Sequence, residues 1–105
     1  MIHLIQAAEG FDWDDGNLLK SESKHGITHA TIEDFFKEKV WVVPDFKHSV
    51  SEERFYAFGK TKDYKPMFVC FTIRFINTKS LIRPISARFM HTKEFNKYVE
   101  AYSKI

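Results

Sequence analysis

Four segments with the composition of β-strands follow one another between residues 40 and 88, and polar turns separate them. Each segment is rich in the β-branched and aromatic residues that favour a pleated strand. Short turns between consecutive strands give antiparallel pairing, because a parallel connection needs a long crossover. The pattern therefore predicts an antiparallel meander whose strands cover residues 40–43, 54–61, 67–75 and 81–88.

Helical patterns precede this block of strands. Asp14 or Asp15 is suited to cap a helix over residues 17–25, and Gly26 is suited to end it. Thr31, with an acidic residue three positions later, is expected to cap a second helix that has one apolar face. Before the first helix, the alternation of apolar and acidic residues from Phe11 predicts a short, half-buried strand.

A further helix is expected at the C-terminal end, where Thr92 can cap it. Helices on both sides of a block of strands are typical of the α+β class. We therefore expect an antiparallel four-stranded twisted sheet with N-terminal helices and a C-terminal helix against one face, and the other face partly open. The length suits a single domain over residues 1–105, with residues 1–10 as an N-terminal extension. The apolar residues of the last helix recur at helical spacing: Phe95, Tyr98, Val99 and Tyr102.

Composition narrows the possible classes of protein. The chain is 44% hydrophobic and has eleven Phe, which favours a folded globule over a disordered chain. No apolar run approaches the roughly 20 residues of a membrane helix, and the N-terminus lacks the basic start of a signal peptide. We therefore expect a cytosolic protein. Cys70, the only cysteine, lies in an apolar run and is expected to be a buried, inert thiol.

Charge is unevenly distributed along the chain. Residues 1–36 carry seven acidic against two basic residues, whereas residues 37–105 carry fourteen basic against seven acidic residues. The larger part therefore has a formal charge of +7, which is typical of a surface that binds a polyanion. Lysines that only solubilise a Phe-rich domain would give a similar balance.

Three arginines lie inside the expected strands and can share one face of the sheet. Because side chains alternate along a strand, Arg54, Arg74 and Arg88 can each point away from the apolar face. Arg83 has the opposite parity from Arg88 and is expected on the other face. Arginine suits phosphate because its planar group donates two parallel hydrogen bonds. The alternative is that Arg54 only pairs with a neighbouring glutamate, and that the others are ordinary surface residues.

The loop before the second strand places a histidine and two carboxylates next to one of these arginines. His48, Glu52, Glu53 and Arg54 lie within seven positions. A strand that only builds a core does not need this mixture. Histidine titrates near neutral pH and can transfer protons, and a carboxylate can act as a base. His48 hydrogen-bonding only within its own loop is an equally consistent interpretation.

Six short motifs occur in an order and spacing that resembles the BrnT family, the ribonuclease members of BrnT/BrnA toxin–antitoxin pairs. The resemblance covers roughly residues 11–100. Family members often have Asn at the position of Ser21 and Ile at the position of Pro84, and they usually lack residues 1–10. Pro84 also removes a donor from its strand, which predicts an edge or a bulge there. The motifs are Phe11-Asp-Trp-Asp-Asp15, Lys24-His-Gly-Ile27, Asp45 with His48-Ser49, Glu52-Glu-Arg-Phe55 with Gly59, Phe71-Thr-Ile-Arg74 and Ile85-Ser-Ala-Arg88.

The resemblance implies a RelE-like fold and metal-independent cleavage of RNA that arrests growth by blocking translation. It also implies neutralisation by a BrnA-like ribbon-helix-helix antitoxin, and operator DNA binding only through the toxin–antitoxin complex. In such a reaction the 2′-hydroxyl of the RNA attacks the phosphate, and arginines stabilise the pentavalent intermediate. We expect Glu52 or Glu53 to act as the base and His48 to transfer a proton. The phosphorane would be stabilised by Arg54, Arg74 and Arg88. Further contacts to the RNA are expected from Lys24, His25 and Tyr56.

A metal site is not expected. His25 and His29 are four residues apart, but Gly26 is expected to end the helix between them. We therefore expect neither a metal nor another cofactor. Two other functions are consistent with the same residues. One is a nucleic-acid-binding regulatory module without catalysis, which would use the basic face and an exposed Tyr56. The other is an inactive protein whose open face only binds an antitoxin.

Overall fold

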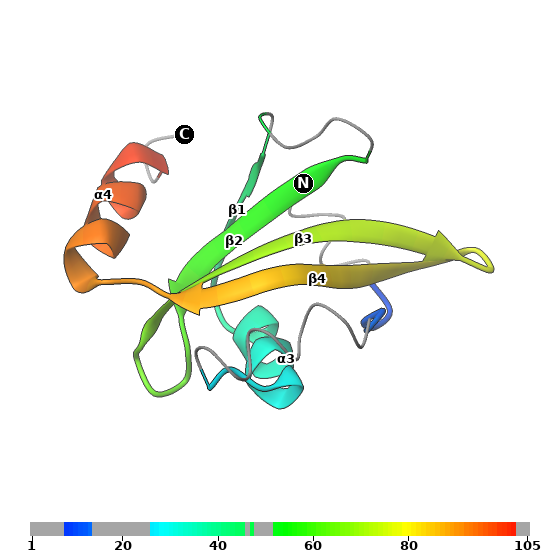
Figure 1. Ribbon diagram of the computed structural model, residues 1–105, viewed down its shortest axis with the longest axis horizontal. Coiled ribbons are helices and arrows are strands. Elements are labelled where there is room, and N and C mark those ends of the chain that lie inside the picture. The colour runs from blue at the N-terminus through cyan, green and yellow to red at the C-terminus, as the bar shows by residue number, and fades with distance from the viewer. Residues whose placement is uncertain (1–7, 14–25, 46, 48–51, 103–105) are drawn as a thin grey trace.

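The computed structural model describes residues 8–13, 26–45, 47 and 52–102. Its centre is one antiparallel sheet in the order β1-β2-β3-β4, with each strand next to its neighbours in sequence (Figure 1). This confirms the predicted four-stranded meander and the α+β class. The strands are β1 (Trp41–Pro44), β2 (Arg54–Lys60), β3 (Pro66–Ile76) and β4 (Lys79–Phe89).

Helix α3 (His29–Lys37) covers one face of the sheet. Ile32 and Phe35 are fully buried, and they pack against alternate residues of β3 such as Val69 and Phe71. The hydrophobic effect stabilises such a side chain by about 1.5–3 kcal/mol when it is buried. The alternation of apolar residues in β3 therefore determines which face becomes the larger core, as the sequence predicted.

Helix α3 begins earlier than its sequence pattern suggested. Thr28 is the N-cap, and its hydroxyl accepts a hydrogen bond of 3.2 Å from the backbone N–H of Thr31. The expectation that Thr31 caps the helix is therefore wrong, because a suitable hydroxyl lies three residues earlier. The helix expected over residues 17–25 lies outside the described residues. One helix precedes the sheet in the part of the chain that the structure describes.

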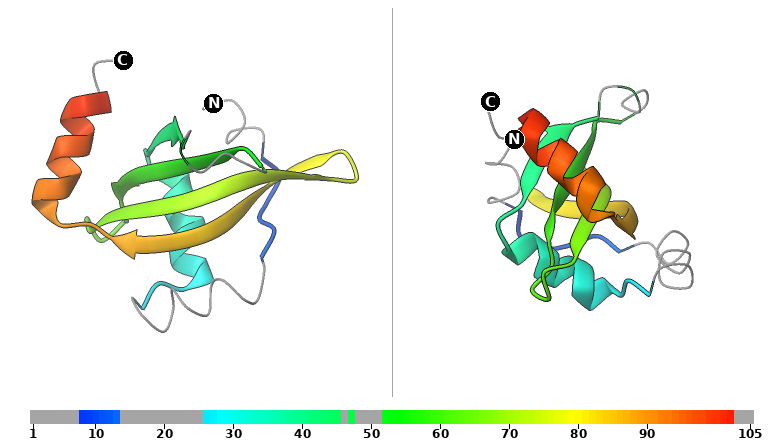
Figure 2. Two further views of the ribbon diagram at one scale, coloured as in Figure 1. Left: turned by 45° about the horizontal axis from the view of Figure 1, so that its top comes forward. Right: turned by 90° about the vertical axis from the view of Figure 1, so that its left-hand side faces the viewer.

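Helix α4 (Thr92–Tyr102) packs on the face opposite α3 (Figures 1 and 2). Phe95 of α4 belongs to a second, smaller cluster with Phe58 of β2, and Phe68 of β3 lies against it. The expectation that helices pack on one face is therefore wrong. Even positions of β2 and β3 supply aromatic residues near α4 and polar residues further along, so this face is apolar at one end only.

A β-bulge lies in β4, opposite the junction of Cys70 and Phe71. Ser86 pairs with Cys70 and Pro84 pairs with Phe71, so Ile85 is the extra residue. This confirms the irregularity that Pro84 predicted. Because one extra residue shifts the alternation, Arg83 lies on the same face as Arg88. The sequence-based assignment of these two arginines to opposite faces is therefore wrong.

The segment before α3 runs beside β4 and extends the sheet. Phe11 forms a parallel bridge with Ile82, whose backbone N–H donates to the carbonyl of Gly10 at 3.0 Å. The half-buried strand expected here is therefore present as a short edge pairing. Phe11 stacks on Trp13, and Trp13 donates to the carboxylate of Glu33 in α3 at 2.9 Å. These contacts hold the segment against both the sheet and the helix.

Candidate active site

Three arginines gather at the end of the sheet that α4 leaves uncovered. Arg54 and Arg83 each lie directly opposite Thr72, which stands between them on β3. Arg74 is two residues further along β3 and therefore shares the face of Thr72. Directly opposed side chains are about 5 Å apart at Cβ and diagonal neighbours about 7–8 Å. We call Arg54, Arg74 and Arg83 the arginine cluster.

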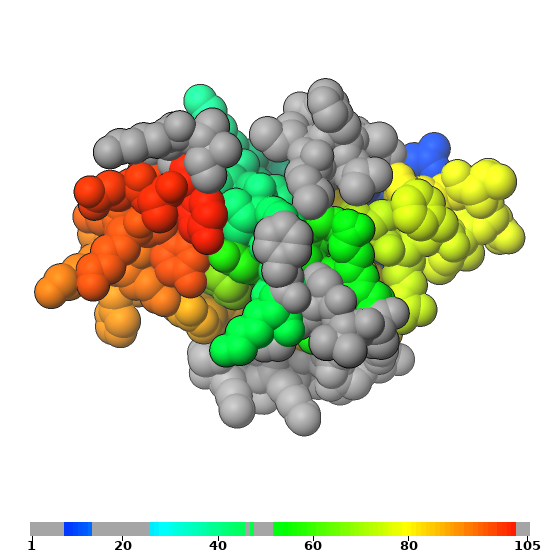
Figure 3. Space-filling view, turned by 90° about the horizontal axis from the view of Figure 1, so that it is seen from above, coloured from blue at the N-terminus to red at the C-terminus, as the bar shows by residue number. Residues whose placement is uncertain are grey.

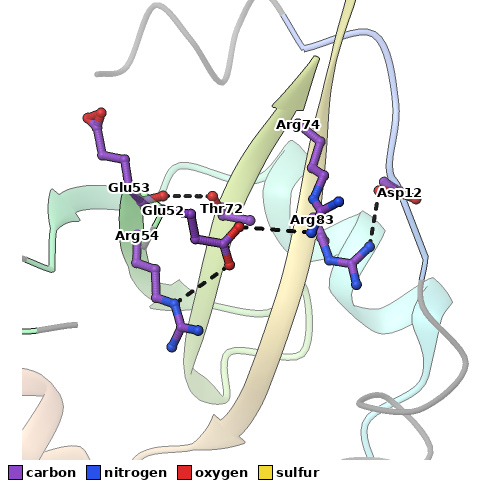
Figure 4. Close-up of polar contacts among 7 residues, drawn as sticks. All are labelled: Asp12, Glu52, Glu53, Arg54, Thr72, Arg74 and Arg83. Carbon is purple, nitrogen blue, oxygen red and sulfur yellow. Dashed lines mark hydrogen bonds and ion pairs between the residues drawn. The ribbon is translucent and has the colours of Figure 1, made fainter. Parts of the chain in front are cut away.

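The carboxylate of Glu52 lies between two members of the arginine cluster (Figure 4). One oxygen is 3.8 Å from Nε of Arg54, and the other is 3.9 Å from Nη2 of Arg74. These are ion pairs beyond hydrogen-bond length, and about a third of the Glu52 side chain is exposed. An ion pair of this length is weaker than a hydrogen-bonded pair, so a phosphate oxygen can replace the carboxylate beside a guanidinium.

Glu53 faces away from the cluster and is exposed. Its backbone carbonyl, however, accepts a 2.6 Å hydrogen bond from the hydroxyl of Thr72, a residue that is only 2% exposed. This bond fixes the start of β2 against β3. The structure thus brings Glu52 to the arginines and uses Glu53 as a backbone anchor, which agrees with the alternation of side chains along β2.

Arg83 is held by Asp12, which comes from the segment beside β4 (Figure 4). Nη1 of Arg83 donates to Oδ2 of Asp12 at 3.2 Å, and the two side chains are 19% and 23% exposed. Sequence reasoning missed both residues. A simple parity count placed Arg83 on the other face, and the signal that could have corrected it was the bulge that Pro84 indicated.

Arg88 lies away from the arginine cluster. It is opposite Phe68, four residues before Thr72 on β3 and therefore about 13 Å from it along the strand. Its guanidinium lies 4.9 Å from the ring centre of Phe68 and donates to both carboxylate oxygens of Glu94 at 3.0 and 2.9 Å. The hydrogen-bonded pair raises the pKa of Arg88 and lowers that of Glu94.

Tyr56 is half-buried rather than exposed. Its ring stacks on Phe68 with ring centres 4.9 Å apart, and its hydroxyl lies 3.0 Å from that of Tyr102 in α4. Burial is the main cause that raises the pKa of Tyr56, and this hydrogen bond raises it further. The neighbouring thiol of Cys70 is half-buried and not buried as expected, and this partial burial raises its pKa. In this conformation Tyr56 helps to hold α4.

Three residues expected at the site, His48, Lys24 and His25, lie outside the described residues. Figure 3 shows α4 (red to orange) and the β3–β4 hairpin (yellow) at opposite ends of the molecule, with β2 (green) between them. A hollow of about 460 Å³ lies beside α4, between residues such as Trp41, Lys60 and Phe95. In the arginine cluster, the side chains of Arg54 and Arg74 are 33% and 45% exposed.

The fold and the cluster define a class of protein: a small α+β domain whose exposed sheet face presents arginines suited to phosphate groups. Residues 13–94 match the model of the ribonuclease toxin family BrnT of type II toxin–antitoxin systems, and the chain belongs to this family. The resemblance seen in the sequence motifs is thereby confirmed. No curated protein matches the chain. None of the described helices is long and apolar enough to cross a membrane.

Membership in the family implies a ribonuclease toxin with RNA as substrate and an antitoxin as partner. Of the residues expected at the site, the structure brings together Glu52, Arg54 and Arg74, and it adds Arg83. Across the described ranges, no group of three or more His, Cys, Asp or Glu side chains is placed to hold a metal ion. The likeness to RelE remains a prediction.

Proposed function

We propose that this chain cleaves RNA by metal-independent transesterification at the arginine cluster, and that cleavage blocks translation in the cytoplasm. The observation that carries the proposal is the carboxylate of Glu52 between the guanidiniums of Arg54 and Arg74. This arrangement provides a base and two phosphate-binding groups within one site. A phosphodiester whose oxygens bind the two arginines would have its reacting atoms next to Glu52.

In the proposed reaction, Glu52 removes the proton from the 2′-hydroxyl of the RNA, and the 2′-oxygen forms a bond to phosphorus. Arg54 and Arg74 stabilise the additional negative charge on the nonbridging oxygens. The bond between phosphorus and the 5′-oxygen then breaks, and we propose that His48 donates a proton to this oxygen. The products are a 2′,3′-cyclic phosphate and a 5′-hydroxyl. Electrons and protons balance without an added oxidant, reductant or metal.

Arg88 is assigned a different role from the one that the sequence suggested. At about 13 Å along the strand from the cluster, it cannot contact the phosphate that Arg54 and Arg74 hold. Its bidentate pair with Glu94 and its contact with Phe68 instead fasten α4 to the sheet. Glu53, which faces away from the arginines, is likewise assigned to backbone anchoring. Glu52 remains as the proposed base.

The test is cleavage of a defined RNA by the purified protein in the presence of EDTA. Glu52→Gln keeps the size of the side chain and removes its basicity, so we expect about 100-fold or more loss of cleavage rate. Binding of RNA should be retained, because the arginines remain. Glu53→Gln is the matched control and should retain activity. Products ending in a 2′,3′-cyclic phosphate are expected. RNA that is bound but left intact by the unmutated protein would instead favour a non-catalytic regulatory module.

The antitoxin partner is proposed to be a small ribbon-helix-helix protein that covers the arginine cluster. An acidic or amphipathic segment suits this face, because it would neutralise the guanidiniums and exclude RNA together. The resulting complex, and not the toxin alone, would bind operator DNA. Co-expression with the protein encoded by the adjacent gene should restore growth and translation. A partner that binds tightly but leaves RNA cleavage unchanged would contradict this mode of neutralisation.

A further inference from the structure

We infer that Arg83, positioned by Asp12, binds an RNA phosphate adjacent to the one that is cleaved. The inference deepens the proposed function and rests on it for the identity of the polyanion. The register of the sheet is the first observation. Arg83 lies directly opposite Thr72 and diagonally from Arg74, so its side chain emerges beside the proposed cleavage site.

The bulge is the second observation. Without the extra residue Ile85, the alternation that places Arg88 on this face would place Arg83 on the face that α3 covers. Ile82 and Pro84, on either side of Arg83, are buried on that opposite face. Bulges commonly redirect a side chain near an active site. Here the bulge allows one strand to present two arginines, Arg83 and Arg88, on the same face.

The third observation is the ion pair with Asp12. At 3.2 Å, and with both side chains less than a quarter exposed, this pair is better shielded from water than the Arg88–Glu94 pair, whose side chains are 42% and 33% exposed. Asp12 is itself fixed, because its backbone N–H donates to the carbonyl of Ile82 at 2.8 Å. A guanidinium that is held in place loses less side-chain entropy when it binds a phosphate. Asp12 is thus a positioning residue.

Geometry also separates the phosphate of Arg83 from the reacting one. Glu52 lies on the β2–β3 side of the cluster, between Arg54 and Arg74, whereas Arg83 and Asp12 lie on the β4 side. The directly opposed series from Arg54 through Thr72 to Arg83 spans two strand spacings, or about 10 Å. A single phosphate at Glu52 would not fill both ends. A second phosphate of the same strand would extend the site across three strands.

The experiment measures binding of a 2′-O-methylated RNA oligonucleotide, which this reaction cannot cleave, at several salt concentrations. Arg83→Gln should weaken binding about 10-fold or more. It should also reduce the slope of log affinity against log salt by about 0.7, the value for one phosphate contact on a single strand. With cleavable RNA the same variant should mainly raise KM, because an adjacent contact binds substrate and transition state alike. An unchanged affinity and salt slope would overturn the inference.

Lys37→Gln is the matched control, because Lys37 also has an acidic partner, Asp34 at 3.7 Å, but lies in α3 on the other face of the sheet. It should leave both affinity and slope unchanged. Arg83→Lys keeps the charge and provides a second variant if Arg83→Gln does not fold. It should have the salt slope of the unmutated protein but a lower RNA affinity, since lysine lacks the planar pair of donors. A lysine variant with the slope of the glutamine variant would contradict the phosphate contact.

Asp12 is tested by a double-mutant cycle. Asp12→Ala should weaken RNA binding several-fold in the unmutated background and have little further effect when Arg83 is already Gln, because residues that act through one another are not additive. An equal effect in both backgrounds would show that Asp12 acts independently of Arg83 and would overturn its positioning role. Binding of uncleavable RNA is measured without catalysis, so a failure of this inference is distinguishable from a failure of the nuclease proposal.

Discussion

Arg54 and Arg88 both face away from the larger core, yet their surroundings give them different tasks. Arg54 meets a carboxylate at 3.8 Å, beyond hydrogen-bond length, whereas Arg88 makes two short hydrogen bonds to Glu94. The pair with Glu94 engages both terminal nitrogens of Arg88, whereas Glu52 meets Arg54 at Nε in a longer ion pair. Residue type and strand parity alone do not separate these cases, because both depend on the position of the partner.

Alanine substitution should therefore separate the two arginines. Arg54→Ala is expected to reduce RNA cleavage about 100-fold, because it removes charge stabilisation at the reacting phosphate, and to change the free energy of unfolding little. Arg88→Ala should cost roughly 1 kcal/mol of stability and leave cleavage by the folded protein within a few-fold of normal. Denaturant unfolding and an RNA cleavage assay measure both. If Arg88→Ala abolishes cleavage in a stable protein, the assignment of Arg88 to α4 is wrong.

The pair of Arg88 and Glu94 also predicts a dependence of stability on pH. The hydrogen bonds from Arg88 lower the pKa of Glu94 from its ordinary value of 4.5 in the folded protein. The pair therefore contributes to the free energy of unfolding. This contribution is fully present above the pKa of Glu94 in the unfolded chain, and it is lost as the pH falls through the lower pKa of the folded protein. Glu94→Gln should therefore destabilise the protein near pH 7 by up to about 1 kcal/mol, and by less as the solution is acidified. A difference that grows with acidification would contradict the pairing.

At the scale of elements, the sequence predicted the strands well because alternation is a local signal. The odd positions of β3 from Met67 to Phe71 are all fully buried, as their apolar character indicated. The start of α3 was placed late because Thr28 and Thr31 are equally plausible caps by composition. The bulge at Ile85 and the side on which α4 packs were not predictable, because both result from pairing between residues far apart in sequence.

Gly59 offers a test of how β1 and β2 approach each other. A Cβ atom at this position would lie 2.9 Å from Cγ1 of Val40 and 3.3 Å from the carbonyl oxygen of Lys39. Gly59→Ala should therefore destabilise the fold by about 1–3 kcal/mol through overpacking. The site at the other end of β2 should still cleave RNA in the folded fraction. Combining Val40→Ala with Gly59→Ala should recover part of the lost stability. Thermal unfolding of the two single variants and the double variant provides the comparison.

At the scale of the whole molecule, one sheet carries two cores on opposite faces, and this division positions the site. The larger core with α3 covers one face along most of its length, whereas α4 covers only one end of the other. The uncovered end presents the arginine cluster beside the projecting β3–β4 hairpin (Figure 1). Moving the α4 cluster to the other end of its face would bury the guanidiniums, which would cost several kcal/mol per unpaired charge.

This arrangement predicts that substrate length determines how strongly salt inhibits the reaction. Two phosphates, one held by Arg54 and Arg74 and the next by Arg83, should give a slope of about −1.4 for log kcat/KM against log salt, at about −0.7 per phosphate on single-stranded RNA. Raising salt fourfold should then slow cleavage of an oligonucleotide roughly 7-fold. A dinucleotide has one phosphate and should lose only about threefold. Equal slopes for the two substrates would mean that no arginine of the cluster binds a flanking phosphate. Unequal slopes that become equal in the Arg83→Gln variant would identify Arg83 as the residue that makes this contact.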